Sequence, residues 1–81
     1  MKTLTEELLV EYGFELGEEK NKHIIKTYSK NKFVVVEEQD GTFYYSYMGF
    51  EYPLKNEDDL QKIYFEVRRE KLLINDLTLH P

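Results

Sequence analysis

Few side chains in this sequence could act as nucleophiles or as metal ligands. The chain has no cysteine and two histidines, His23 and His80. Neither histidine has a second ligand at the spacing typical of zinc sites, and nucleophilic catalysis needs a nucleophile beside a base and an orienting group. The sequence therefore predicts that both histidines are surface residues.

Acidic residues are plentiful, but their spacing predicts neither a catalytic pair nor a cation site. Glu37 and Glu38 are neighbours on a predicted strand, so their side chains point to opposite faces. The run Glu57–Asp59 is explained by a helix start and lacks the ligand spacing of a calcium loop. Gly13 and Gly17 are not followed by the Gly-Lys-Ser/Thr sequence of a phosphate loop. We therefore expect a protein that is not an enzyme and that needs no cofactor or metal.

The aromatic run Thr42–Tyr52 is the most unusual stretch of the chain. As a structural feature, it predicts a core strand with a cross-strand aromatic face. As a functional feature, it predicts either a stacking platform for single-stranded nucleic acid or a protein-binding patch.

The formal net charge is −5, from 16 acidic and 11 basic residues. This balance disfavours duplex DNA, whose binding depends on counterion release by basic residues, and it is also an ordinary charge for solubility. Residues 20–32 contain five lysines and no acid. No apolar stretch reaches the ~20 residues of a membrane helix, and the acidic N-terminal segment is unlike a signal peptide. Together with the absence of cysteine, these features predict a cytoplasmic protein with no membrane partner.

Two helices are predicted, one near each end of the chain. The first, Thr5–Tyr12, has a threonine as candidate N-cap and is followed by Gly13, which suits a left-handed C-terminal cap. The second, Glu57–Glu70, follows Asn56 as N-cap and has acidic residues in its first turn. Its apolar stripe has helical spacing and is predicted to pack onto a sheet: Leu60, Ile63, Tyr64 and Val67.

The segments between the helices read as strands because they are rich in β-branched and aromatic residues. These are His23–Ser29, Phe33–Glu38 and Thr42–Met48, with Phe14–Gly17 as a candidate for a fourth. The sequence therefore predicts one α+β domain over residues 1–81, a small antiparallel sheet of three or four strands flanked by an N-terminal and a C-terminal helix. The tail Leu72–Pro81 is predicted either to return as a strand or to stay loose.

Two short loops set the predicted register. Asp40-Gly41 predicts a two-residue type I′ hairpin turn, and Lys30-Asn31 is a weaker candidate for another. With these loops, Val36 faces Tyr45. The predicted core face holds Ile25, Thr27, Val34, Val36, Phe43, Tyr45 and Tyr47. The opposite face holds Lys22, Ile24, Lys26, Tyr28, Phe33, Val35, Tyr44 and Met48. A one-residue slip at Lys30-Asn31 would turn part of this second face toward the core.

The second face combines lysines with large apolar groups, which is unusual for a solvated sheet face. The sequence leaves three outcomes open. The first helix covers part of it through Leu4, Leu8 and Tyr12, a second copy of the chain covers it, or it is an open binding patch. For the open patch, the candidate binding residues are Lys22, Lys26, Tyr28, Phe33, Tyr44 and Met48.

The two ends of the chain carry a family resemblance. The segment Leu60–Leu72, with the sequence LQKIYFEVRREKL, resembles the LQxLYFxLTGxEL ending of short uncharacterised proteins of phage and mobile-element type in Bacteroidetes. The N-terminal helix leading to Tyr12-Gly13-Phe14 is similar to the Asn-Gly-Phe helix ending of that family. The chain departs from the pattern at Arg68-Arg69, where the family has Thr-Gly. The resemblance implies a similar fold and origin, and brings no known activity or catalytic residues.

These features predict a small non-enzymatic protein-binding module of phage or mobile-element type, with a host or phage protein as partner. The first alternative is a single-stranded nucleic-acid binder that uses the lysine and aromatic sheet face, although nucleic acid is the less favoured partner. The second is an acidic inhibitor that mimics DNA. A homodimer is also consistent with the sequence.

Overall fold

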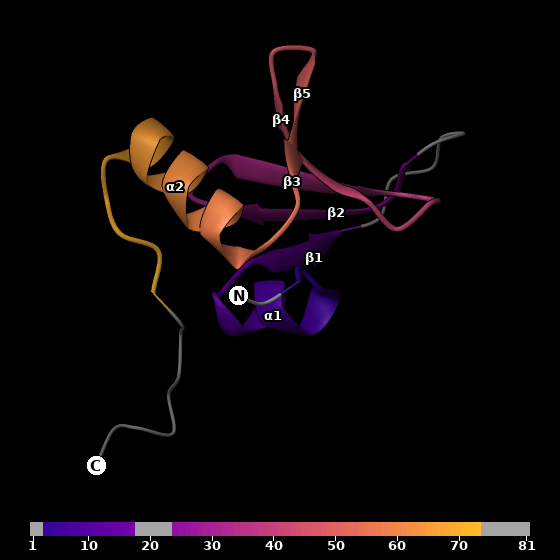
Figure 1. Cartoon of the computed structure of the whole chain (residues 1–81), viewed down its shortest axis with the longest axis horizontal. Helices are drawn as coiled ribbons and strands as arrows, with labels where there is room; N and C mark the ends of the chain where they lie inside the picture. Colours follow the sequence, from indigo (N-terminus) through magenta and orange to yellow (C-terminus); the bar gives the residue numbers. More distant parts are fainter. Residues whose placement is uncertain (1–2, 18–23, 74–81) are drawn as a thin grey trace.

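The computed structural model describes residues 3–17 and 24–73, without the side chain of Ile25. The elements, in chain order, are α1 (Glu6–Glu11), β1 (Glu15–Gly17), β2 (Ile24–Lys30), β3 (Phe33–Glu38), β4 (Phe43–Tyr47), β5 (Phe50–Leu54) and α2 (Glu57–Arg68). The strands form one antiparallel sheet in the order β1-β2-β3-β4-β5, so each strand pairs with its neighbour in the chain (Figure 1). The predicted α+β class is confirmed, but the sheet has five strands rather than three or four.

Both helices begin and end through local hydrogen bonds. In α1, Thr5 is the N-cap and its hydroxyl accepts from the Leu8 amide at 3.1 Å. The helix closes with a Schellman motif, in which the Phe14 amide donates to the Leu9 carbonyl while Gly13 has a φ of 90°. In α2, the N-cap side chain accepts from the Asp59 amide at 3.0 Å.

The second helix ends earlier than predicted. Glu70 was expected to be its last residue, but α2 stops at Arg68 because Arg69 adopts the left-handed conformation, with a φ of 59°. The Arg69 amide still donates to the Phe65 carbonyl, which satisfies one of the free acceptors of the last turn. The tail positions 74–81 and the segment 18–23, including His23 and His80, lie outside the described residues.

The loop at Asp40-Gly41 closes a hairpin as predicted, but it has three residues rather than two. Gly41 donates to the Glu38 carbonyl, and Glu38 donates to the Thr42 carbonyl. Gly41 has a φ of 88°, whereas Asp40 does not have a positive φ. This geometry is a type I turn followed by a left-handed glycine, not the predicted type I′ turn. The Asp40 carboxylate fixes it by accepting from the hydroxyl and the amide of Thr42, which lowers the pKa of Asp40.

The extra loop residue moves the β3–β4 register by one position, so that Val35 rather than Val36 faces Tyr45. The other loop comprises Asn31 and Lys32, both with positive φ, instead of Lys30-Asn31. The β2–β3 register therefore differs from the predicted one by two positions. Because side chains alternate with a period of two, the residues of β2 and β3 that share a face are still those predicted.

The predicted division of the sheet into two faces is therefore wrong at the β3–β4 junction. The helix-covered core face combines residues from both predicted faces: Tyr28, Phe33, Val35, Phe43 and Tyr45. Val34 and Tyr44 are half-buried on the opposite face. Val36 is also on that face and is buried, because Thr27 and Tyr44 flank it on the neighbouring strands. Tyr47 was predicted to be buried but is exposed.

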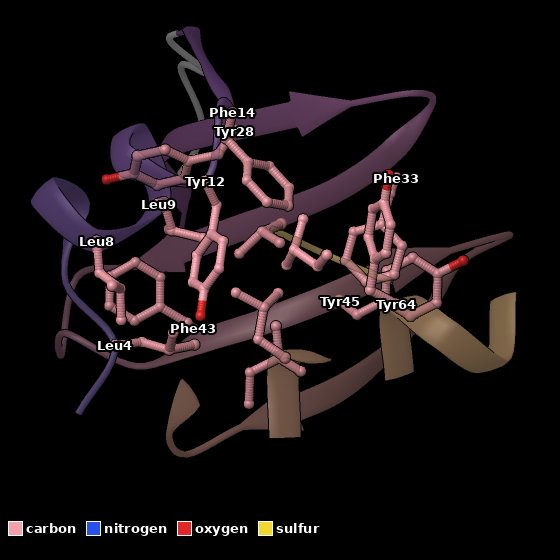
Figure 2. Packing of buried hydrophobic residues seen from close by; sticks show 14 residues of the cluster. Leu4, Leu8, Leu9, Tyr12, Phe14, Tyr28, Phe33, Phe43, Tyr45 and Tyr64 are labelled. Carbon is pink, nitrogen blue, oxygen red and sulfur yellow. The ribbon is translucent and has the colours of Figure 1, made fainter. Parts of the chain in front are cut away.

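Both helices contribute to one apolar core on this face. Figure 2 shows Leu4, Leu8 and Leu9 packed at one end of the core, and Phe33, Tyr45 and Tyr64 at the other. The ring of Phe33 stacks on Tyr45 with centroids 4.2 Å apart, and Tyr64 of α2 lies 4.9 Å from Phe33. Of the predicted α2 stripe, Leu60 and Tyr64 are buried and Ile63 is partly buried, whereas Val67 is exposed.

Three core tyrosines keep their rings buried and direct their hydroxyls to carboxylates at the edge of the core. Tyr12 donates to Glu57, Tyr28 donates to Glu37 at 2.7 Å, and Tyr64 donates to Glu70 at 3.0 Å. Burial and then the Glu57 hydrogen bond raise the pKa of Tyr12 to about 12. Burial and then Glu37 raise the pKa of Tyr28 as well. The Tyr12 hydroxyl also accepts from Gln61 at 2.7 Å and so joins α1 to α2.

The first prediction tests the core contact of α2. Leu60→Ala removes a fully buried side chain and should lower the free energy of unfolding by about 2–5 kcal/mol. That is a large fraction of the ~5–8 kcal/mol expected for a domain of this size. Val67→Ala, on the same stripe but 41% exposed, should cost less than about 1 kcal/mol. Urea denaturation of both variants measures the difference, and equal costs would contradict this packing.

The second prediction concerns alkaline pH. Unfolded tyrosines ionise near pH 10, whereas Tyr12 keeps its proton up to about 12. Between these values the folded chain binds more protons than the unfolded chain, so its stability is complete below pH ~10 and falls as the pH rises through the folded pKa. We expect the melting temperature to fall across this window, and to fall less steeply for Tyr12→Phe. Parallel curves for the two proteins would contradict the assignment.

Candidate functional site

The residues predicted to form a lysine and aromatic binding face do not share one surface. Tyr28 and Phe33 are 0% exposed and belong to the core. Lys26 forms an ion pair with Glu6 of α1. Tyr44 is half-buried on the opposite face, and Met48 is exposed in the loop between β4 and β5. Lys22 lies outside the described residues.

Helix packing explains why this face is not open. Leu4, Leu8 and Tyr12 belong to the same buried cluster as Tyr28 and the other core residues of the sheet. The outcome in which the first helix covers part of the face is therefore the one that the structure contains, although Phe33 packs against Tyr64 of α2 and Tyr44 lies on the opposite face. The side chain of Lys30, at the edge of this face, donates to the Tyr12 carbonyl and joins β2 to the end of α1.

Among the described residues, nine large hydrophobic side chains are exposed, and four of them lie together on the β4–β5 hairpin instead. We call this surface the hairpin patch, and it comprises Tyr47, Met48, Phe50 and Tyr52 of the hairpin together with Val67 of α2. Tyr47 pairs with Phe50 across the two strands, and both are more than half exposed. Figure 1 shows the outer part of this hairpin projecting from the body of the molecule on the side of α2.

A groove runs between the hairpin and α2, with a volume of about 240 Å³. This hairpin groove is lined by Tyr45, Tyr47, Tyr52, Ile63, Glu66 and Val67. The three tyrosine rings are nearly parallel, since Tyr45 makes interplanar angles of 15° with Tyr47 and 27° with Tyr52, at centroid distances of 6.1 and 6.0 Å. Tyr45 also stacks on Phe33, so the inner end of the groove is anchored in the core.

Met48 has an unfavourable backbone conformation for its residue type. Its φ is 49°, and Gly49 follows with a φ of 83°, so the two residues form a left-handed two-residue turn. Asn, Asp or Gly is preferred at the first position of such a turn. Here the position holds a long flexible side chain that is 79% exposed. Because strained residues often occur at functional positions, this methionine suggests that the hairpin tip has a role other than stability.

The groove is lined by tyrosine rings, and among the described residues Glu66 is its one charged lining residue. Burial raises the pKa of Tyr45, and the nearby Tyr47 and Tyr52 raise it further, so its hydroxyl stays neutral at physiological pH. Arg68 is close enough to Tyr45 to oppose this shift, and Glu66 lines the groove. Within residues 3–17 and 24–73, no group of three His, Cys, Asp or Glu side chains is placed to hold a metal ion.

A larger hollow, of about 420 Å³, lies at the opposite end of the β4–β5 hairpin. Its wall includes Thr3, Thr42, Phe43, Leu54 and Lys55. Among the described residues that line it, Lys55 is the one with a charged side chain. No helix in the described part of the chain is long and apolar enough to cross a membrane.

No protein-family model, curated protein or solved structure matches this chain. The resemblance to phage and mobile-element proteins of Bacteroidetes stays a prediction from the sequence.

The sequence drew attention to the aromatic run, but it placed only Thr42–Met48 of that run in a strand. The turn at Met48-Gly49 divides that run into β4 and β5, and β5 was not predicted. Gly49 was the available signal, but a methionine before it is not a usual hairpin residue. The contribution of Val67 was also missed, because the helical stripe predicted that this residue is buried.

The third prediction tests the strain at the hairpin tip. Met48→Asn places a residue that tolerates the left-handed region at this position, and it should raise the free energy of unfolding by about 0.5–1 kcal/mol. Met48→Gln keeps a long side chain without that tolerance and is the matched control. Thermal denaturation compares the two with the natural chain. A Met48→Asn protein no more stable than the control would show that the turn is not strained.

Proposed function

We propose that this chain is a small non-enzymatic protein-binding module, and that the hairpin patch is its contact surface. The observation that carries the proposal is the contiguous exposure of Tyr47, Met48 and Phe50 beside an aromatic groove. Large exposed apolar patches on small domains usually mark interaction sites. Interface cores are enriched in aromatic residues and methionine, which is the composition of this patch.

A protein partner fits the patch better than single-stranded nucleic acid does. Binding to single strands combines stacking aromatics with a basic track that follows the phosphates. The groove has the aromatic rings, but an acid, Glu66, lines it. Arg68 is the base that lies close enough to Tyr45 to affect its pKa, and one base does not make a basic track. The acidic mimic of DNA has less support, because Glu57 and Asp59 are engaged by Tyr12 and the Lys55 amide.

The kind of partner and the cellular location are proposed from the sequence alone. The resemblance of Leu60–Leu72 to short phage and mobile-element proteins supports a host or phage protein as the partner. Inhibition of a host factor and a role in particle assembly are both consistent with a small binding module. The cytoplasm is the proposed location, because it is where such a partner would be met.

The fourth prediction tests the patch with a tagged chain and a lysate of a Bacteroidetes host. Phe50→Ala should reduce the captured partner about tenfold or more, because aromatic anchors at the centre of an interface carry most of its binding energy. Phe65→Ala is the matched control, since Phe65 is 51% exposed on α2 and is not part of the hairpin patch. Quantitative mass spectrometry of the eluates measures the ratio.

Two results would contradict the proposal. One is a captured partner that is insensitive to both Phe50→Ala and Tyr47→Ala while both variants keep their melting temperatures. The other is tight binding to single-stranded oligonucleotides that weakens steeply with salt, which would favour the nucleic-acid alternative.

A further inference from the structure

The hairpin patch contains both a protrusion and a hollow that it could fill. Met48 and Phe50 project at the hairpin tip, with exposed fractions of 79% and 64%. The hairpin groove, of about 240 Å³, lies next to the tip, because its lining residue Tyr47 pairs with Phe50 across the hairpin. A two-fold dimer needs one surface that is complementary to itself, so that a contact made by the first chain on the second is repeated in reverse. A patch that carries both a protrusion and a hollow meets that condition.

The exposed apolar area supplies most of what a dimer interface needs. If each of the four hairpin residues has about 200 Å² of surface, their exposed fractions leave roughly 500 Å² of apolar area per chain. Two such patches supply roughly 1,000 Å², and the surrounding polar rim adds to this. A stable protein–protein interface buries about 1,200–2,000 Å² in total.

The charges near the groove allow two copies to approach each other. Glu66 lines the groove, and the positive charge of Arg68 is close enough to the groove residue Tyr45 to lower that tyrosine's pKa. A two-fold axis can place an acid of one chain near a base of the other when both signs occur in one patch, whereas a patch of one sign would repel itself. The net charge of −5 opposes association more generally, but charges farther apart than ~8 Å are largely screened at physiological ionic strength.

Pairing of two chains through the free edge of β5 is disfavoured. β5 is an edge strand of the sheet, and Pro53 lies in it. Proline has no amide hydrogen to donate to a neighbouring strand, and it is a common means of preventing edge-to-edge association. Contact through the exposed aromatic face is therefore favoured over a continuous sheet across two chains.

We infer that, in the absence of its partner, the chain forms an isologous dimer in which the hairpin tip of each copy occupies the hairpin groove of the other. The inference rests on the proposed function, because the partner and the second copy use the same patch. Binding of the partner then requires dissociation of the dimer.

Sedimentation equilibrium of the purified natural chain tests the inference, from about 10 to about 500 µM, a range that covers micromolar and weaker dissociation constants. The natural chain should show a reversible monomer–dimer equilibrium. Phe50→Ser should raise the dissociation constant about tenfold or more, and Phe65→Ser, similar in exposure but outside the hairpin patch, should leave it unchanged. Met48→Lys is a second variant at the tip, which keeps the test valid if Phe50→Ser does not fold.

A natural chain that is monomeric at the highest concentration would overturn the inference. A dimer unaffected by Phe50→Ser and Met48→Lys would also overturn it, because another surface would then form the contact. The two proposals fail separately. If the chain is monomeric but Phe50→Ala still abolishes capture of a partner from lysate, the proposed function stands without the dimer.

Discussion

The stacked pair of Phe33 and Tyr45 is the contact on which the rest of the structure depends. Their rings are 4.2 Å apart and nearly parallel, and Tyr64 of α2 packs against Phe33 from the helix side. The pair therefore joins adjacent strands and holds α2 on the sheet. Tyr45 also stacks with Tyr47 and Tyr52, so a ring of the core supports the rings of the exposed patch.

Local chemistry made part of this fold predictable. The caps at Thr5 and Asn56, the strand Phe33–Glu38 and the hairpin at Asp40-Gly41 follow from short-range preferences and are found in the structure. The choice of faces was not predictable, because Asp-Gly fits both a two-residue and a three-residue loop, and one residue reverses the alternation. The strand β5 was missed because its turn begins with Met48.

The candidate site was predictable in composition but not in shape. The aromatic run was recognised as unusual, yet two of the residues chosen for a binding face, Tyr28 and Phe33, are buried in the core under the helices. The actual patch arises where the sheet extends past the end of its helical cover. It has a rigid base, since Tyr45 is held by the core, and an adaptable tip, since methionine is flexible and polarisable. That combination suits a surface that must fit the shape of another protein.

The meander order of the sheet affects how the chain reaches this structure. Every described strand pairs with its neighbour in sequence, so nearly all backbone pairings close short loops and cost little chain entropy. Proteins dominated by such local pairings fold faster than sheets built from distant segments. Contacts between segments far apart in the sequence are made instead by the hydrogen bonds of Tyr12 with Glu57 and Gln61, and by the β-bridge between Thr3 and Asn56. The N-terminal helix and α2 are thus joined by polar contacts over a shared apolar core, whereas the backbone pairing of the hairpin that carries the patch closes only a short turn.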